Sequence, residues 1–67
     1  MSSENQLVAT LHGGRSKKSF KVFWNPTTQK VVVEQPDFFG STRIDTRCLA
    51  SSRNMAFNVA EAFLHDK

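Results

Sequence analysis

Two short segments separated by a turn sequence constrain the fold of this chain more than any other feature. Residues 20–24 (FKVFW) and 30–35 (KVVVEQ) are rich in aromatic and β-branched side chains, which favour the pleated surface of a sheet. Between them, Asn25 and Pro26 suit the first and second positions of a type I turn, because Pro fixes φ at the value that the second position needs. This pattern predicts a β-hairpin.

Two further segments extend the predicted sheet. Residues 6–12 alternate between two sets of side chains with a period of two, which is typical of a half-buried strand. Residues 41–49 alternate in the same way, and here a fourth strand and an extended loop are both open. We expect Pro36 and Asp37 to end the second hairpin strand, because Pro cannot donate to a sheet ladder.

A helix is predicted over residues 53–65. The Ser51–Ser52 pair supplies an N-cap, since a serine hydroxyl can accept from a free N–H of the first turn. Met55, Val59 and Phe63 recur every four residues, so they lie on one side of the helix and form an apolar stripe. The helix is therefore expected to pack against the sheet with this stripe.

These elements define an α+β fold in a single domain, residues 1–67, in which residues 1–5 are a flexible tail. A sheet must bury one apolar face, and only one helix is available to cover it. We therefore expect a three- or four-stranded antiparallel sheet packed against one C-terminal helix. The expected core consists of Leu7, Ala9, Leu11, Phe20, Val22, Trp24, Val31, Val33, Ile44, Met55, Val59, Ala60 and Phe63.

The single cysteine and the lack of long apolar runs exclude several classes of protein. Cys48 cannot form an intrachain disulfide, and a lone thiol fits a reducing, cytoplasmic setting. Cys48, His12 and His65 are too few ligands for a structural zinc site, so neither a metal nor another cofactor is expected. No run approaches the ~20 apolar residues of a membrane span, and the start lacks a signal-peptide pattern, so no membrane contact is expected.

Catalysis has little support. Cys48 with His12 or His65 would be the only conceivable nucleophile pair, and a lone buried cysteine usually behaves as a small apolar residue. Gly13 and Gly14 lack the further glycines of a phosphate-binding loop. A domain of this size also has little room for a concave pocket. We therefore expect a binding module without a small-molecule substrate, and not an enzyme.

A cluster of cations points to the partner. Residues 15–21 carry four of the chain's nine Lys and Arg residues, and residues 5–29 contain no acid. Alternation places Lys21, Phe23 and Asn25 on the face away from the helix, and Arg43 and Arg47 join them if the fourth strand forms. Cations neutralise phosphates, and an aromatic ring can stack on a base. The candidate nucleic-acid contacts are Arg15, Lys17, Lys18, Lys21, Phe23, Asn25, Lys30, Arg43 and Arg47.

Two other interpretations stay open. The cations can simply solvate the uncovered face of a small sheet, where Glu34 and Asp45 would dilute the positive charge. Alternatively, surplus apolar side chains mark a protein contact, either a homodimer or the regulation or inhibition of a larger protein. That interface would consist of Phe38, Phe39, Phe57 and Leu64. Phe38 and Phe39 can instead fold back over the helix flank and complete the core.

Residues 23–30 (FWNPTTQK) resemble the hairpin of the N-terminal arm-type DNA-binding domains of phage integrases in the tyrosine recombinase family. Residues 55–62 (MAFNVAEA) resemble the helix that closes those domains. The resemblance implies a three-stranded sheet that enters the major groove of DNA while the helix supports its back. By position, it also implies that the sheet and turn contacts are Lys21, Phe23, Asn25 and Lys30.

Two departures count against this resemblance: the stretch 36–50 is longer than the connection in that family, and no catalytic domain follows. A free-standing domain is expected instead to be a small regulator of phage or plasmid type. Residues 52–56 (SRNMA) are similar to the start of the final helix in double-stranded RNA-binding domains, but that fold needs a helix before its sheet and residues 1–5 are too short to supply it. We therefore expect a small basic protein that binds nucleic acid, and specifically double-stranded DNA, through a sheet face and the loop of residues 15–21.

Overall fold

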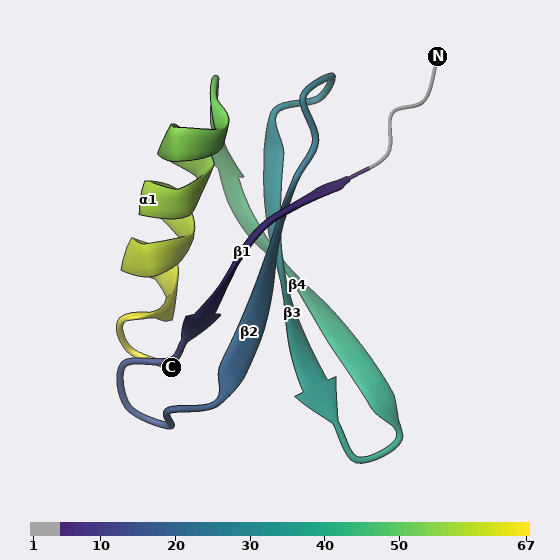
Figure 1. Ribbon diagram of the computed structural model, residues 1–67, viewed down its shortest axis with the longest axis vertical. Helices are drawn as coiled ribbons and strands as arrows, with labels where there is room; N and C mark the ends of the chain where they lie inside the picture. Colours follow the sequence, from purple (N-terminus) through teal and green to yellow (C-terminus); the bar gives the residue numbers. More distant parts are fainter. Residues whose placement is uncertain (1–4) are drawn as a thin grey trace.

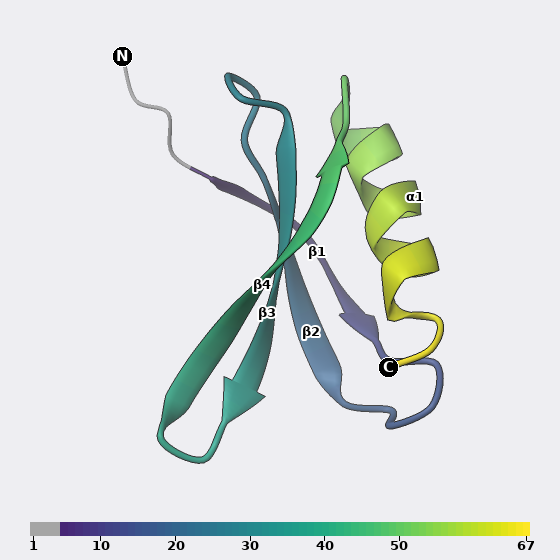
Figure 2. The same ribbon diagram turned by 180° about the vertical axis from the view of Figure 1, so that it is seen from behind.

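The computed structural model describes residues 5–67, with Asp37 described by its backbone alone. Four strands form one antiparallel sheet in the order β1-β2-β3-β4, and one helix packs on one face of it (Figure 1, Figure 2). The predicted α+β fold is confirmed, and the fourth strand is present. Residues 1–4 of the predicted tail lie outside the described residues. The elements are β1 (Gln6–His12), β2 (Ser19–Trp24), β3 (Lys30–Asp37), β4 (Gly40–Leu49) and α1 (Arg53–Leu64).

Because consecutive strands are neighbours and antiparallel, their connections lie at alternate ends of the sheet. The β1–β2 loop (residues 13–18) and the β3–β4 turn (residues 38–39) share one end, which we call the loop end. The β2–β3 turn (residues 25–29) lies at the other, the turn end. The helix starts at the turn end and runs back to the loop end, where the C-terminus lies (Figure 1).

Asn25 organises the predicted hairpin turn. Its side-chain Oδ1 accepts from the N–H of Thr27 at 2.8 Å and from that of Thr28 at 3.1 Å. Its backbone N–H donates to the carbonyl of Lys30 at 3.1 Å, and its carbonyl accepts from Gln29 at 2.7 Å. An asparagine that satisfies backbone groups within its own turn favours this chain reversal strongly, which is why the local sequence predicts the hairpin.

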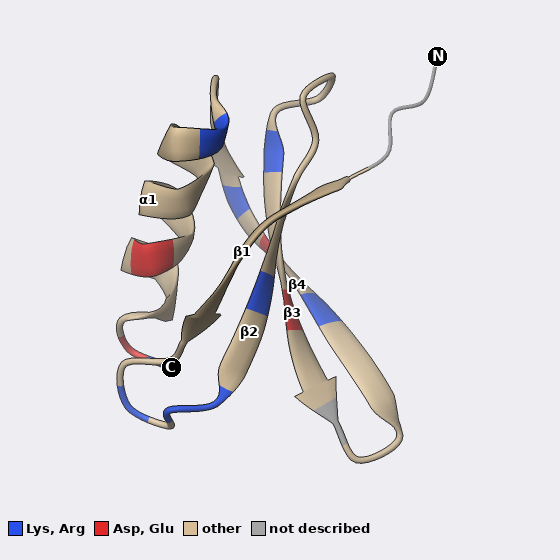
Figure 3. Cartoon of the chain, viewed as in Figure 1, with Lys and Arg blue, Asp and Glu red and all other residues tan. Residues whose placement is uncertain are grey.

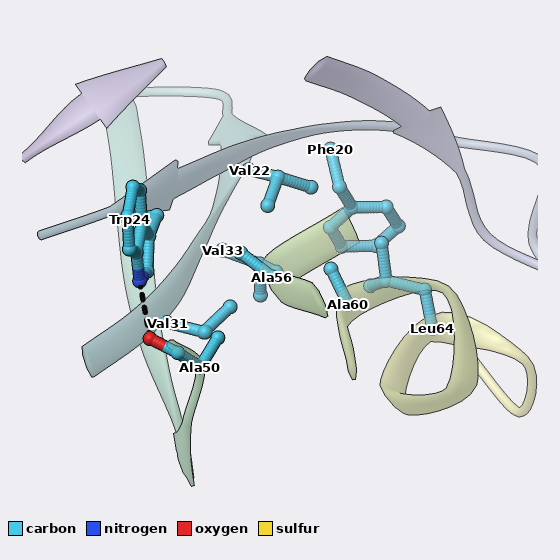
Figure 4. Packing of buried hydrophobic residues seen from close by; sticks show 9 residues of the cluster. All are labelled: Phe20, Val22, Trp24, Val31, Val33, Ala50, Ala56, Ala60 and Leu64. Atoms are coloured by element: carbon cyan, nitrogen blue, oxygen red, sulfur yellow. Dashed lines mark hydrogen bonds between the residues drawn. The ribbon is translucent and has the colours of Figure 1, made fainter. Parts of the chain in front are cut away.

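The core lies between the inner face of β2 and β3 and one side of the helix (Figure 4). Val22, Val31 and Val33 are fully buried, and each contributes about 2 kcal/mol by leaving water. Trp24 donates from Nε1 to the carbonyl of Ala50 at 2.8 Å, which fixes the link between β4 and α1 to the sheet. The other buried apolar residues are Phe20, Ala56, Ala60 and Leu64.

The helix faces the sheet with a different stripe from the predicted one. Ala56 and Ala60 are completely buried, whereas Met55, which was expected in the core, is 46% exposed. The buried stripe of Ala56, Ala60 and Leu64 is displaced by one position along the sequence from the predicted stripe. The helix is therefore rotated about its axis by about 100° from the expected orientation. Small alanines let the helix approach the sheet closely, and Val59 and Phe63 then pack at the edge of the core. The N-cap is confirmed, because the hydroxyl of Ser52 accepts from the N–H of Met55.

A bulge in β1 explains the second error in the expected core. Leu7 pairs with Phe23 and Ala9 pairs with Val22, so Val8 is an extra residue between two paired positions. An extra residue reverses the side-chain alternation of a strand. Leu7 therefore shares the outer face with Phe23 and is 51% exposed, while Val8 packs against the core.

A larger irregularity interrupts the alternation of β4. Lys30 pairs with Leu49, and Val32 pairs with Asp45. The same interval thus takes two residues on β3 and four on β4, so β4 carries two extra residues. Inside this bulge, Thr46 is buried and its Oγ1 donates to the carbonyl of Val31 at 2.8 Å. Alternation from residue 41 therefore holds only as far as Asp45.

β3 extends through Pro36 to Asp37, although a proline at this position predicts an earlier end. Pairing between β2 and β3 stops at Glu34, while Pro36 is still paired with Ser41 of β4. Beyond Glu34, β3 pairs only with β4 among the described strands. Proline is tolerated there because it removes no hydrogen bond to β2.

We predict that Thr46→Val lowers the free energy of unfolding by about 1–3 kcal/mol, because it leaves the buried carbonyl of Val31 without its donor at nearly constant side-chain shape. Urea denaturation followed by circular dichroism measures this change. Thr10→Val, at an exposed strand position, is the matched control and should change stability little. Equal stability of the two variants would contradict a structural role for the Thr46 hydroxyl.

Candidate nucleic-acid interface

Three exposed cations lie in the β1–β2 loop, which runs through the loop end of the sheet (Figure 3). Its Gly13 N–H donates to the carbonyl of Lys18 at 2.9 Å, and the N–H of Lys17 donates to the carbonyl of Gly13 at 3.2 Å. Lys17 adopts the left-handed conformation, with φ of 59°. The loop thus closes on itself, and Arg15, Lys17 and Lys18 all project to solvent.

The end of the helix holds this loop in place. The N–H of Gly14 donates to the carbonyl of Leu64 at 2.9 Å, and the N–H groups of Arg15 and Ser16 donate to the carbonyl of Lys67 at 2.8 and 2.9 Å. The carbonyl of Leu64 lies at the helix C-terminus and lacks a partner within the helix. Lys67 follows the helix, so the loop binds both the helix end and the residues just after it. The cations are therefore carried by a fixed backbone.

The face of the sheet that α1 leaves uncovered carries charges of both signs. Glu34 on β3 lies between two cations: it is paired with Lys21 of β2 and with Arg43 of β4. The Nε of Arg43 lies 3.2 Å from Oε2 of Glu34, and its guanidinium lies 5.5 Å from the ring centre of Phe23. Asp45 is exposed on the same face, opposite Val32. The sheet face is therefore mixed in charge, as the solvated-face interpretation expects.

Three predicted contacts lie away from the basic loop, towards the turn end. Lys30 begins β3 and Arg47 lies in the bulge near the end of β4, so both are towards the turn end. The bulge gives Arg47 a φ of 61° and removes it from the alternation that would place it beside Arg43. Asn25 is only 5% exposed, and its side chain serves the hairpin turn. The structure thus divides the predicted set between the two ends of the molecule.

Two aromatic rings form the tip of the β3–β4 hairpin. Phe38 is 95% exposed and Phe39 is 99% exposed, with ring centres 6.0 Å apart and ring planes tilted by 52°. The alternative in which they fold back over the helix is therefore wrong. Gly40 follows them with φ of 139°, a conformation that side chains other than glycine rarely adopt, and lets β4 start directly after a two-residue turn.

The predicted apolar patch on the helix flank does not form as expected. Leu64 is 1% exposed and belongs to the core, and Phe57 is half-buried. The four apolar residues assigned to a protein interface therefore do not make one surface, and the exposed pair, Phe38 and Phe39, lies on the hairpin tip.

Two hollows lie towards the loop end of the sheet. One, of about 440 Å³, is lined by Lys18, Ser19, Gln35, Pro36 and Phe38. The other, of about 340 Å³ on the uncovered face, includes Lys21 and Glu34 in its lining. Sequence analysis missed this juxtaposition of Lys18 with Phe38, although a meander of four strands places the first and third connections at the same end.

The described residues include no cluster of three His, Cys, Asp or Glu side chains that could hold a metal ion. Cys48 is exposed near the turn end, while His12 and His65 lie at the loop end, so the structure does not bring together the nucleophile pair that we considered. Within residues 5–67, no helix combines the length and the apolar character needed to cross a membrane.

No protein-family model, curated protein or solved structure matches the chain. The likeness of its hairpin and helix to the integrase arm-binding domains therefore stays a prediction, as does the likeness of residues 52–56 to double-stranded RNA-binding domains.

We predict that Gly14→Ala lowers the melting temperature by several degrees, because the new Cβ would overlap the carbonyl of His65 and force the loop away from the helix end. Overpacking of this kind costs about 1–3 kcal/mol. The melting curve is followed by circular dichroism. Ser16→Ala, in the same loop, creates no overlap and removes only a long, exposed hydrogen bond of 3.4 Å from the N–H of Lys18. It is the control and should melt close to the wild type. A Gly14→Ala protein as stable as the control would show that the loop is not tightly held.

Proposed function

We propose that this protein is a nucleic-acid-binding module that engages double-stranded DNA with the cations of its β1–β2 loop. The observation that carries the proposal is the display of Arg15, Lys17 and Lys18 in an acid-free loop fixed to the end of α1. A fixed backbone reduces the entropy that is lost when cations are positioned on phosphates. Binding then gains from the release of the counterions that surround the nucleic acid.

Lys21 extends this surface from the loop onto the uncovered sheet face. It is exposed, and no ion pair is found for it within the described part of the chain. Arg43 contributes less than the sequence implies, because Glu34 and the ring of Phe23 already engage its guanidinium. The proposed interface therefore centres on the loop, with the sheet face at its border.

The exposed, single thiol of Cys48 fits a protein that works in a reducing compartment, so we place this activity in the cytoplasm. A role as a small regulator of phage or plasmid type is compatible with such a module and rests on the hairpin likeness alone.

We predict micromolar binding to duplex DNA, with a slope of log K against log salt of about −3 to −4 if four cations each contact a phosphate. Lys17→Ala combined with Lys18→Ala should reduce the steepness of this slope by about 2. Fluorescence anisotropy at several salt concentrations provides both values.

The matched control is Lys30→Ala combined with Arg47→Ala, which removes the same charge from the turn end. It should leave the slope close to that of the wild type. An equal loss in both double variants would mean that net charge, and not the loop, determines binding. No binding of duplex DNA at low salt would refute the proposed function.

A second candidate function is protein binding, and the exposed pair Phe38 and Phe39 favours it. Contiguous exposed aromatic side chains often mark protein contacts, so the tip can serve a homodimer or dock on a larger protein. Sedimentation velocity over a range of concentrations tests the homodimer. Self-association that is lost in the Phe38→Ala, Phe39→Ala double variant is the result expected for it, and a monomer at every concentration would exclude it.

A further inference from the structure

We infer that the loop end is a binding site for unpaired nucleotides, in which a base stacks on the Phe38–Phe39 tip and the adjacent phosphate is bound by Lys18. This inference rests on the proposed nucleic-acid function and specifies its ligand: a single-stranded segment, such as the overhang of a duplex. It gives the aromatic tip a role in the same complex as the basic loop.

The first support is the display of the two rings. At 95% and 99% exposure, nearly the whole surface of both phenylalanines faces water. The two-residue turn places both side chains at the very tip of the hairpin, because Gly40 resumes pairing at once. The stacking of a base on an exposed aromatic side chain contributes about 1–3 kcal/mol.

The second support is the hollow between the tip and the loop. Lys18 and Phe38 line the same open depression, which has a volume of about 440 Å³. Ser19 and Gln35 add polar residues to its lining, and none of the described residues that line it is acidic. Apolar, polar and cationic groups thus meet in the combination that a nucleotide requires.

The position of the cations favours nucleic acid over a protein as the occupant. A protein that buried the two rings would have no need of an acid-free cationic loop at the opposite side of the hollow. A nucleic-acid strand needs both, because its bases alternate with phosphates along the chain. Unpaired bases are favoured over a duplex, since bases within a duplex already stack on one another and present their faces only at an end or after unstacking.

The inference is tested by fluorescence anisotropy with three labelled ligands of equal length: a single strand, a duplex with an unpaired overhang and a blunt duplex. We predict that Phe38→Ala combined with Phe39→Ala weakens binding to the single strand and the overhang by at least about fivefold. Binding to the blunt duplex should change by less than about twofold, because the loop cations are intact.

The control removes two exposed apolar side chains from the other end of the molecule, by Leu7→Ala combined with Met55→Ala. It should change binding to each ligand by less than about twofold. A 2-aminopurine base in the overhang supplies a second readout, because its fluorescence falls when it stacks. Wild-type protein should lower this fluorescence below that of the free ligand, and the phenylalanine double variant should not.

The outcomes separate this inference from the proposed function. If all proteins bind the blunt duplex and the phenylalanine variant binds every ligand like the wild type, the stacking site is refuted while the loop function stands. If no ligand is bound, both fail. If the phenylalanine variant loses self-association in sedimentation and keeps full affinity for single strands, the tip is a protein contact and the inference is overturned.

Discussion

Ala56, Ala60 and Leu64 bring α1 into close contact with β2 and β3, and this contact determines which parts of the sheet remain uncovered. A helix of 12 residues is about 18 Å long, whereas a strand of 10 residues such as β4 can extend over about 34 Å. One helix therefore cannot cover the sheet from end to end. The far part of the β3–β4 hairpin projects beyond the helix, as Figure 1 shows, and carries its two aromatic rings into solvent.

The same helix also fixes the other half of the candidate site. The carbonyl of Leu64 at its end and that of Lys67 just after it accept hydrogen bonds from the β1–β2 loop. The cations and the aromatic tip are thus placed at one end of the molecule by two independent sets of contacts. The loop is held by a helix terminus and the tip by strand pairing. Neither set of contacts depends on the mixed charges of the uncovered sheet face, so the geometry of the candidate site is independent of them.

Local sequence predicted the parts of the fold that local interactions determine. Asn25 closes the turn with its own side chain, and Ser52 caps the helix within a single turn, so both could be read without knowledge of the tertiary structure. The bulges at Val8 and around Thr46 could not, because strand register depends on the partner strand and on the core. The rotation of the helix towards Ala56 likewise depends on how closely it can approach the sheet.

In the candidate site, too, local features were predicted from the sequence and features that depend on tertiary packing were not. The basic loop of residues 15–18 is continuous in sequence and was predicted, whereas the neutralisation of Arg43 depends on a register that sets Glu34 opposite it. The exposure of Phe38 was left open, because its burial depends on how far the helix reaches. The position of Lys18 and Phe38 beside the same hollow was not predicted, because the two residues belong to separate connections between strands.

We propose that the loop end is the nucleic-acid-binding surface. Amide chemical-shift mapping of the ¹⁵N-labelled protein, titrated with a short DNA duplex that carries an unpaired overhang, identifies the residues that contact the nucleic acid. We predict shifts concentrated in residues 14–21 and 35–41, with the β2–β3 turn and the first turns of α1 unchanged. Shifts confined to the turn end or to the exposed side of the helix, or no shifts at low salt, would contradict it.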